Sequence, residues 1–126
     1  MKKAISTSQA PAAIGTYSQA IVHGNTLYTS GQIPIDPATG EMLGNDFGQQ
    51  AHRVFKNLQA VATAAGTELQ AAIKLTVYLQ DLNQFAGLNE IMSEYFNQPY
   101  PARAAVQVAR LPKDALIEID AIIGMP

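Results

Sequence analysis

Arg103 is the residue of this chain whose type and setting most favour chemistry with a small acidic molecule. It follows a Pro-Ala step and opens an alternating, strand-like segment. A guanidinium carries a planar fork of N–H donors that matches a carboxylate through two parallel hydrogen bonds. Arg103 is therefore a candidate carboxylate anchor, and a surface or interface ion pair is the ordinary alternative for such a residue.

Glu118 is the candidate acid or base. It lies inside the apolar segment 116–123, where an acidic side chain must either face solvent, together with Asp120, or have a partner. If that face is enclosed, the carboxylate loses solvation and becomes a plausible general acid or base for water. If the last two strands form a hairpin, Arg103 and Glu118 share a sheet face only when Ala105 pairs with Asp120. Pairing Val106 with Asp120 places them on opposite faces.

Tyr17, Ser30 and Asn89 are the remaining polar candidates: a phenol at a strand start, a hydroxyl at a strand end and an amide on a helix. Each also has an ordinary structural interpretation, as a core tyrosine, a turn residue and a solvent-facing helix position. His23 and His52 have no second ligand at a suitable spacing, so we expect no metal site.

These residues must be positioned by an alternating set of strands and helices. Hydrophobic periodicity and breakers predict the following elements: a hairpin of strands 17–22 and 26–30, a loop over 31–44, a helix from Phe47 capped by Asp46 and stopped by Gly66, a strand over 73–79, a helix over 84–96 and strands over 103–110 and 116–123. The residues expected to face inward on the second helix are Phe85, Leu88, Met92, Tyr95 and Phe96. This order predicts an α+β fold in which the last two strands form a hairpin.

Two helices can cover only one face of a sheet of five or six strands, yet the last strand carries apolar residues at both parities. Charged residues make up only 14% of the chain, below the roughly 25% of ordinary soluble domains. Both observations predict that a second copy of the chain covers the other face, so we expect a homo-oligomer.

Length and charge narrow the function classes. The 126 residues predict a single domain, residues 1–126. A net charge of −2 with eight scattered basic residues argues against a nucleic-acid-binding surface. The absence of cysteine excludes disulfides and thiolate chemistry. No signal-peptide-like or membrane-spanning apolar run is present, so a cytoplasmic protein without membrane association is expected.

Ordered motifs along nearly the whole chain resemble the RidA (YjgF) family, the reactive intermediate deaminases. The matching segments are 12–15 (AAIG), 17–20 (YSQA), 28–34 (YTSGQIP), 36–40 (DPATG), 74–79 (KLTVYL), 101–103 (PAR), 108–113 (VARLPK) and 117–119 (IEI), with Asp81, Phe85, Asn89, Tyr95 and Phe96. Two departures stand out: Thr16 replaces a frequent proline before Tyr17, and Ala105 occupies a position that is often cysteine.

The resemblance implies a chorismate-mutase-like α+β fold, with a mixed sheet and two helices on one face, assembled as a homotrimer. Its sheets would form a central barrel with sites in the clefts between subunits. It also implies cofactor-free hydrolysis of 2-aminoacrylate and 2-aminocrotonate, through the imines 2-iminopropanoate and 2-iminobutanoate, to 2-oxo acids and ammonia. By position, Arg103 would bind the substrate carboxylate and Glu118 would position or activate water. The other substrate-binding positions would be Tyr17, Ser30, Gly31, Asn89 and Ala105.

Two other functions remain open on the sequence. The same cleft could belong to a non-catalytic module that binds small 2-oxo or amino acids. A ribonuclease, as claimed for some relatives, fits poorly with the negative net charge and the absence of a basic cluster. The preferred imine, the pathway and the regulation do not follow from the sequence.

Overall fold

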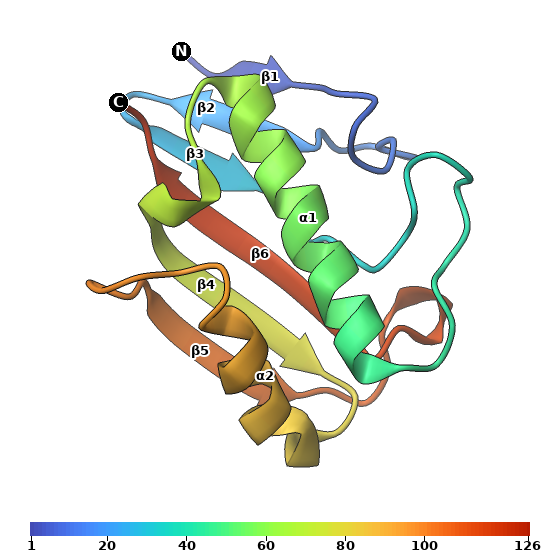
Figure 1. Ribbon diagram of the computed structural model, residues 1–126. Coiled ribbons are helices and arrows are strands. Elements are labelled where there is room, and N and C mark those ends of the chain that lie inside the picture. Colours follow the sequence, from blue (N-terminus) through green and yellow to red (C-terminus); the bar gives the residue numbers. More distant parts are fainter.

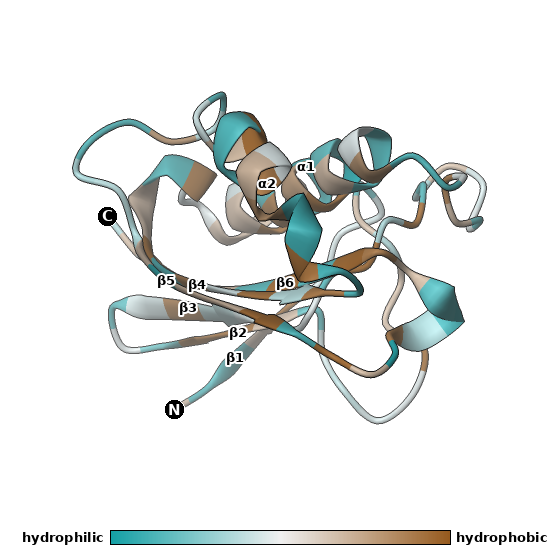
Figure 2. Cartoon of the chain, turned by 90° about the horizontal axis from the view of Figure 1, so that it is seen from below, coloured by the Kyte–Doolittle hydropathy of each residue, from teal (hydrophilic) through white to brown (hydrophobic).

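The structure is a computed structural model that describes residues 1–126 and contains one six-stranded sheet and two α-helices. The elements in chain order are β1 (Lys3–Ile5), β2 (Ala20–His23), β3 (Thr26–Thr29), α1 (Phe47–Ala65), β4 (Ala72–Leu79), α2 (Phe85–Met92), β5 (Ala102–Gln107) and β6 (Ile117–Gly124). Both helices lie on the same side of the sheet (Figures 1 and 2). The predicted α+β class, with a mixed sheet and two helices on one face, is confirmed.

Helix α1 begins and ends where local signals predict. The Asp46 carboxylate accepts a hydrogen bond from the backbone N–H of Gln49 at 3.1 Å and caps the first turn. Gly66 ends the helix in the left-handed region, at φ 89°, which costs a glycine little. The apolar stripe of α1 is buried against the sheet: Ala51, Val54, Phe55, Leu58, Val61 and Ala62.

The sheet buries one face and leaves the other without helices. Along β6, Ile117, Ile119, Ala121 and Ile123 are buried, and the residues between them are half-buried. This two-residue period places the first set against the helices and the second set on the helix-free face. Tyr28 and Val106 are also on the helix-free face, where they remain 46% and 45% exposed.

The strand order is β1-β2-β3-β6-β4-β5, and only β4 and β5 are parallel. The predicted hairpin of the last two strands is therefore wrong, because β6 lies between β3 and β4, whereas β5 is an edge strand beside β4. A parallel pair needs a crossover connection, which α2 supplies between β4 and β5 (Figure 1). The apolar β6 occupies the buried centre and the alanine-rich β5 the edge, so neither register considered for a β5–β6 hairpin occurs.

Several predicted boundaries also need correction. The strand expected from Tyr17 begins only at Ala20, so Tyr17 lies in a loop, and β1 was not predicted at all. Helix α2 ends at Met92, before Tyr95 and Phe96. Strand β5 ends at Gln107, three residues before the predicted end at 110, and β6 begins at Ile117, one residue after the predicted start at Leu116. The predicted hairpin turn at His23-Gly24-Asn25 is present between β2 and β3.

Buried polar side chains hold the loop over 31–44 onto the core. The Asn57 amide of α1 donates to the Ile35 carbonyl at 3.0 Å, and the Gln50 amide donates to the Gly44 carbonyl at 2.6 Å. Gln50 also accepts from the backbone N–H of Leu116 at 2.9 Å. Because both side chains are buried, these bonds satisfy side-chain polar groups that water cannot reach. They connect α1, the loop and the start of β6, which carries Glu118.

Candidate functional site

The residues predicted to do chemistry divide between two pockets on opposite faces of the sheet. Arg103 is paired with Leu75 of β4, whereas Glu118 is paired with Tyr78 of the same strand. Directly paired residues project to the same face, and Leu75 and Tyr78 have opposite parity along β4. Arg103 therefore lies on the helix-covered face and Glu118 on the helix-free face. Within one chain they cannot act on the same small molecule.

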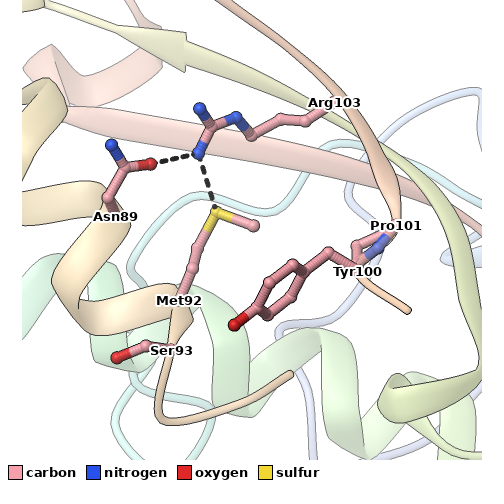
Figure 3. A pocket seen from close by; sticks show the side chains of 6 residues that line it. All are labelled: Asn89, Met92, Ser93, Tyr100, Pro101 and Arg103. Atoms are coloured by element: carbon pink, nitrogen blue, oxygen red, sulfur yellow. Dashed lines mark hydrogen bonds between the residues drawn. The ribbon is translucent and has the colours of Figure 1, made fainter. Parts of the chain in front are cut away.

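The Arg103 pocket is a cavity of about 470 Å³ between α2 and the start of β5 (Figure 3). It is lined by Asn89, Met92, Ser93, Tyr100, Pro101 and Arg103. The Arg103 Nη1 donates to the Asn89 Oδ1 at 2.5 Å and contacts the Met92 sulfur at 3.5 Å. Both partners come from α2, so one helix orients the guanidinium.

Phe85 completes this support. The Arg103 guanidinium carbon lies 4.7 Å from the centre of the Phe85 ring, a cation–π distance. Phe85 was expected to face the core, but its ring is partly exposed beneath the guanidinium. The hydrophobic periodicity of the helix identifies Phe85 only as an apolar position, so it could not predict the contact with Arg103.

Arg103 carries a positive charge without an acidic partner. All its hydrogen bonds go through Nη1 to neutral groups, and the two ion pairs of the chain involve other residues. Its Nε and Nη2 groups donate to no protein atom. These two N–H groups form the side of the guanidinium fork that binds a carboxylate in bidentate fashion.

The Glu118 pocket is a second cavity, of about 610 Å³, on the other side of β6. It brings together four of the predicted site residues: Tyr17, Ser30, Gly31 and Glu118. Its wall also includes apolar residues of the N-terminal loop and of the loop after β3, among them Ile14, Ile33 and Ile35. Ala105 lines neither pocket; it lies two residues after Arg103 on the same face of β5.

Gly31 is required for the position of Glu118. A Cβ atom at residue 31 would lie 2.9 Å from the Glu118 carboxyl carbon and 3.2 Å from its Cγ, and its nearest neighbour would be the carboxylate oxygen Oε2. These distances are shorter than side chains normally allow. The carboxyl group therefore packs directly on the Gly31 backbone. The neighbouring residues Gln32 and Ile119 exchange backbone hydrogen bonds of 2.8 and 3.2 Å, which hold the two segments together.

The environment of Glu118 disfavours its charged form. Burial raises the pKa of the Glu118 carboxyl above its ordinary value, and the nearby negative charge of Asp120 raises it further. A carboxyl group with a raised pKa is a better proton acceptor and donor near neutral pH than an exposed one.

Tyr17 and Ser30 are held by the backbone around them. The Ser30 hydroxyl donates to the Ser18 carbonyl at 2.6 Å, and the Tyr17 hydroxyl accepts from the Ile14 N–H at 3.3 Å. The buried Gln19 amide bonds to the backbone of Thr7 and Pro11. The sequence did not identify this structural role of Gln19. The only signal that could have indicated it is the position of Gln19 between two predicted pocket residues, Tyr17 and Ser30.

Lys113 is a further residue that the sequence did not single out. It is the only cation that lines the Glu118 pocket, and it has φ 55°, with Asp114 following at φ 56°. Two consecutive non-glycine residues in the left-handed region are unusual. Arg110 forms hydrogen bonds of 2.7 and 3.3 Å with the Asp114 carboxylate and stabilises this turn.

The structure contains neither a cluster of metal-ligating side chains nor a membrane-spanning helix. No three side chains of His, Cys, Asp or Glu gather closely enough to hold a metal ion. Neither helix has the length and apolar character needed to cross a membrane.

Comparisons with known proteins agree with this architecture. The family model described as Endoribonuclease L-PSP matches residues 7–124. A RutC family protein of Pyrococcus horikoshii is 55% identical over 122 residues, which cover 97% of each chain. The 2-iminobutanoate/2-iminopropanoate deaminase of Rattus norvegicus is 48% identical over 97% of this chain and 89% of its own.

Solved structures give the same result. The crystal structure of RidA from the Antarctic bacterium Psychrobacter sp. PAMC 21119 superposes with a TM-score of 0.94 at 50% identity, over 98% of this chain and 99% of that one. The match of the family model, the identities over nearly full length and the shared fold together show that this chain belongs to the endoribonuclease L-PSP family, also known as the RidA/YjgF family.

Proposed function

We propose that this protein is a hydrolytic deaminase of small 2-imino acids, which arise from the enamines 2-aminoacrylate and 2-aminocrotonate. The products would be the 2-oxo acids and ammonia. The observation that carries the proposal is the free side of Arg103: a supported guanidinium with no acidic partner and two unused N–H groups suits a carboxylate. The family membership and the deaminases among the relatives point to the same chemistry.

The active site would be formed by two copies of the chain, the Arg103 pocket of one and the Glu118 pocket of the other. The opposite faces of the two residues support this arrangement, because one chain cannot bring them together. The helix-free sheet face, with its exposed Tyr28 and Val106, supplies apolar area for the contact. We propose the chorismate-mutase-like homotrimer, in which three such faces enclose a central barrel and create three equivalent sites.

Glu118 would carry the proton through the reaction. As a water oxygen bonds to the imine carbon, its proton passes to the Glu118 carboxylate and the C=N π electrons move to nitrogen. The protonated Glu118 then returns this proton to the nitrogen, which gives a carbinolamine. Glu118 next removes the proton of the carbinol hydroxyl and delivers it to the same nitrogen, so the C–N bond breaks, the C=O bond forms and ammonia departs. The sum is imine plus water giving 2-oxo acid plus ammonia, so no cofactor is required.

The remaining site residues would bind and orient the substrate. Arg103 would anchor the carboxylate, and Asn89 would hold the guanidinium while its amide borders the cleft. Tyr17, Ser30 and Gly31 would line the part of the site around Glu118. The backbone of Ala105, two residues beyond Arg103, would face the ligand. Holding an already electrophilic carbon beside a positioned water accounts for catalysis without a nucleophilic side chain.

The test is a coupled assay in which threonine dehydratase generates the imine and formation of 2-oxobutanoate or ammonia is followed. Wild-type protein is expected to accelerate the hydrolysis, and Arg103→Ala to lower kcat/KM by at least about 100-fold, because it removes a charge-assisted bidentate contact. Lys56→Ala, which removes the same charge from an exposed position on α1, is the control and should behave as wild type.

Two outcomes would contradict the proposal. Wild-type turnover by Arg103→Ala would remove Arg103 from the site. Binding of 2-oxobutanoate in calorimetry, without any acceleration of hydrolysis, would instead favour the non-catalytic binding module.

The family description names an endoribonuclease, so ribonuclease activity is the second candidate. A net charge of −2 gives RNA little electrostatic attraction. RNA cleavage by highly purified protein that persists in Arg103→Ala would favour this activity. We place the proposed deaminase in the cytoplasm, with small 2-imino and 2-enamino acids as its partners and no role for nucleic acid or membrane.

A further inference from the structure

Two carboxylates lie on the helix-free face of β6, and a tyrosine connects them. Glu118 and Asp120 are two residues apart on this strand, so their side chains project to the same face. Tyr78 of β4 is paired with Glu118, but its hydroxyl donates to the Asp120 Oδ2 at 3.0 Å. The phenol therefore runs diagonally from the position beside Glu118 to the carboxylate of Asp120.

Tyr78 is suited to act as a permanent donor. Burial raises the pKa of the Tyr78 hydroxyl, and its hydrogen bond to Asp120 and the charges of Asp120 and Glu118 raise it further. It therefore stays protonated throughout the neutral range. This bond restrains the Asp120 side chain beside β4.

No cation neutralises the pair. Neither Glu118 nor Asp120 takes part in an ion pair. The other titratable groups on the helix-free face or around the Glu118 pocket are His23, Tyr28, Lys74, Tyr17 and Lys113. Because neither carboxylate has an ion-pair partner, the negative charge of Asp120 acts on Glu118 directly, and it is the second cause, after burial, of the raised pKa of Glu118.

We propose that Asp120, held by Tyr78, is a positioning residue whose negative charge helps Glu118 to keep a proton for delivery to the departing amine. The proposal rests on the proposed deaminase function and adds a residue to it. An isolated exposed carboxyl group is a weak proton carrier near neutral pH, and a neighbouring negative charge makes it a stronger one.

The first experiment does not depend on activity. The carboxyl carbon of Glu118 is followed by NMR as pH is varied, in wild type, Asp120→Asn and the control Glu68→Gln, an exposed acid of equal charge. Asn at 120 still offers an oxygen to the Tyr78 hydroxyl, so the fold should be retained. We expect the pKa of Glu118 to fall in Asp120→Asn and to stay unchanged in Glu68→Gln. An unchanged Glu118 pKa in a folded Asp120→Asn protein overturns the proposal.

The second experiment is the pH profile of kcat/KM in the imine-hydrolysis assay. Glu118 must be ionised to accept a proton from water, so activity is lost as pH falls through its raised pKa. In Asp120→Asn this acid limb should move to lower pH, and the variant should keep a larger fraction of its pH 8 rate at pH 5. Asp120→Glu, which retains the charge, should restore the wild-type profile.

The outcomes separate this proposal from the function on which it rests. A lowered Glu118 pKa with an unmoved acid limb overturns the catalytic role of Asp120. An inactive wild-type protein overturns the deaminase function, and the NMR titration then still decides whether Asp120 acts on Glu118. If Asp120→Asn does not fold, Asp120→Ser, which is smaller and also uncharged, is titrated in its place.

Discussion

The Arg103 pocket and the Glu118 pocket are built in opposite ways. Side chains of a single helix support Arg103: Asn89 accepts its hydrogen bond, Phe85 lies beneath it and Met92 contacts it. Glu118 has no such support and packs on the backbone of Gly31, beside another carboxylate. The structure orients the guanidinium of the first residue before a ligand binds and disfavours the charged form of the second.

This difference matches the tasks proposed for the two residues. An anchor works best when its donors are oriented before the ligand arrives, because less ordering remains to be done on binding. A proton carrier must change its charge during the reaction, so an environment that brings its two forms closer in free energy is useful. The comparison predicts that damage to the first pocket mainly weakens binding, and damage to the second mainly slows the chemical step.

The largest expected effect comes from mixing two inactive variants. Arg103→Ala lacks the anchor and Glu118→Gln lacks the proton carrier, but each keeps the other pocket intact. If the site takes one pocket from each of two copies, random reassembly of equal amounts restores both functional residues in about one quarter of the sites. The measurement is imine hydrolysis before and after the two variants are unfolded and refolded together.

The controls are each variant unfolded and refolded alone, which should remain inactive. A mixture that recovers no activity, although wild-type protein survives the same treatment, would show that the two residues do not meet across an interface.

Gly31→Ala should damage only the Glu118 pocket. The added methyl group would collide with the Glu118 carboxyl and displace it, and a shift of about 1 Å at a reacting group can cost about 100-fold in rate. We expect kcat to fall by that order while binding of 2-oxobutanoate in calorimetry changes little. Gly44→Ala is the matched control, since a Cβ atom at residue 44 meets no neighbour. An unchanged kcat in Gly31→Ala would show that Glu118 is free to move without loss.

Phe85→Leu should damage only the Arg103 pocket, and by less. It removes the ring beneath the guanidinium, a contact worth roughly 0.5–1 kcal/mol at a partly exposed position, so KM should rise about 2- to 5-fold with kcat nearly unchanged. Steady-state kinetics in the coupled imine-hydrolysis assay measure both constants. A fall in kcat without a change in KM would contradict the separation of roles between the two pockets.

The smallest effect is on stability. The folded protein raises the pKa of Glu118, so the folded state binds a proton more tightly than the unfolded chain, and stability is lost as pH rises through the folded pKa. Glu118→Gln removes this penalty and should be more stable than wild type at pH 8, with the difference disappearing below the ordinary carboxyl pKa. Urea unfolding at both pH values measures it. A variant less stable than wild type at pH 8 would indicate that Glu118 has a favourable partner.

The sequence predicted best what depends on neighbours along the chain. The bounds of α1 follow from the Asp46 cap and the left-handed Gly66, and the alternating pattern located β4 and most of β6. It predicted worst what depends on side chains bonding to distant backbone. Gln19 holds the loop that carries Tyr17, and nothing in the local pattern distinguishes that loop from a continued strand.

The sequence by itself determined the chemical types available: one arginine at a strand entrance, one glutamate inside an apolar strand, and the family to which both belong. Only the tertiary structure decided that they lie on opposite faces, because β6 pairs with β3 and β4 and leaves β5 at the edge. Strand order is set by which apolar strands gain most from central burial, a comparison across the whole sheet that no local window contains. That order makes a site between two copies the arrangement to test.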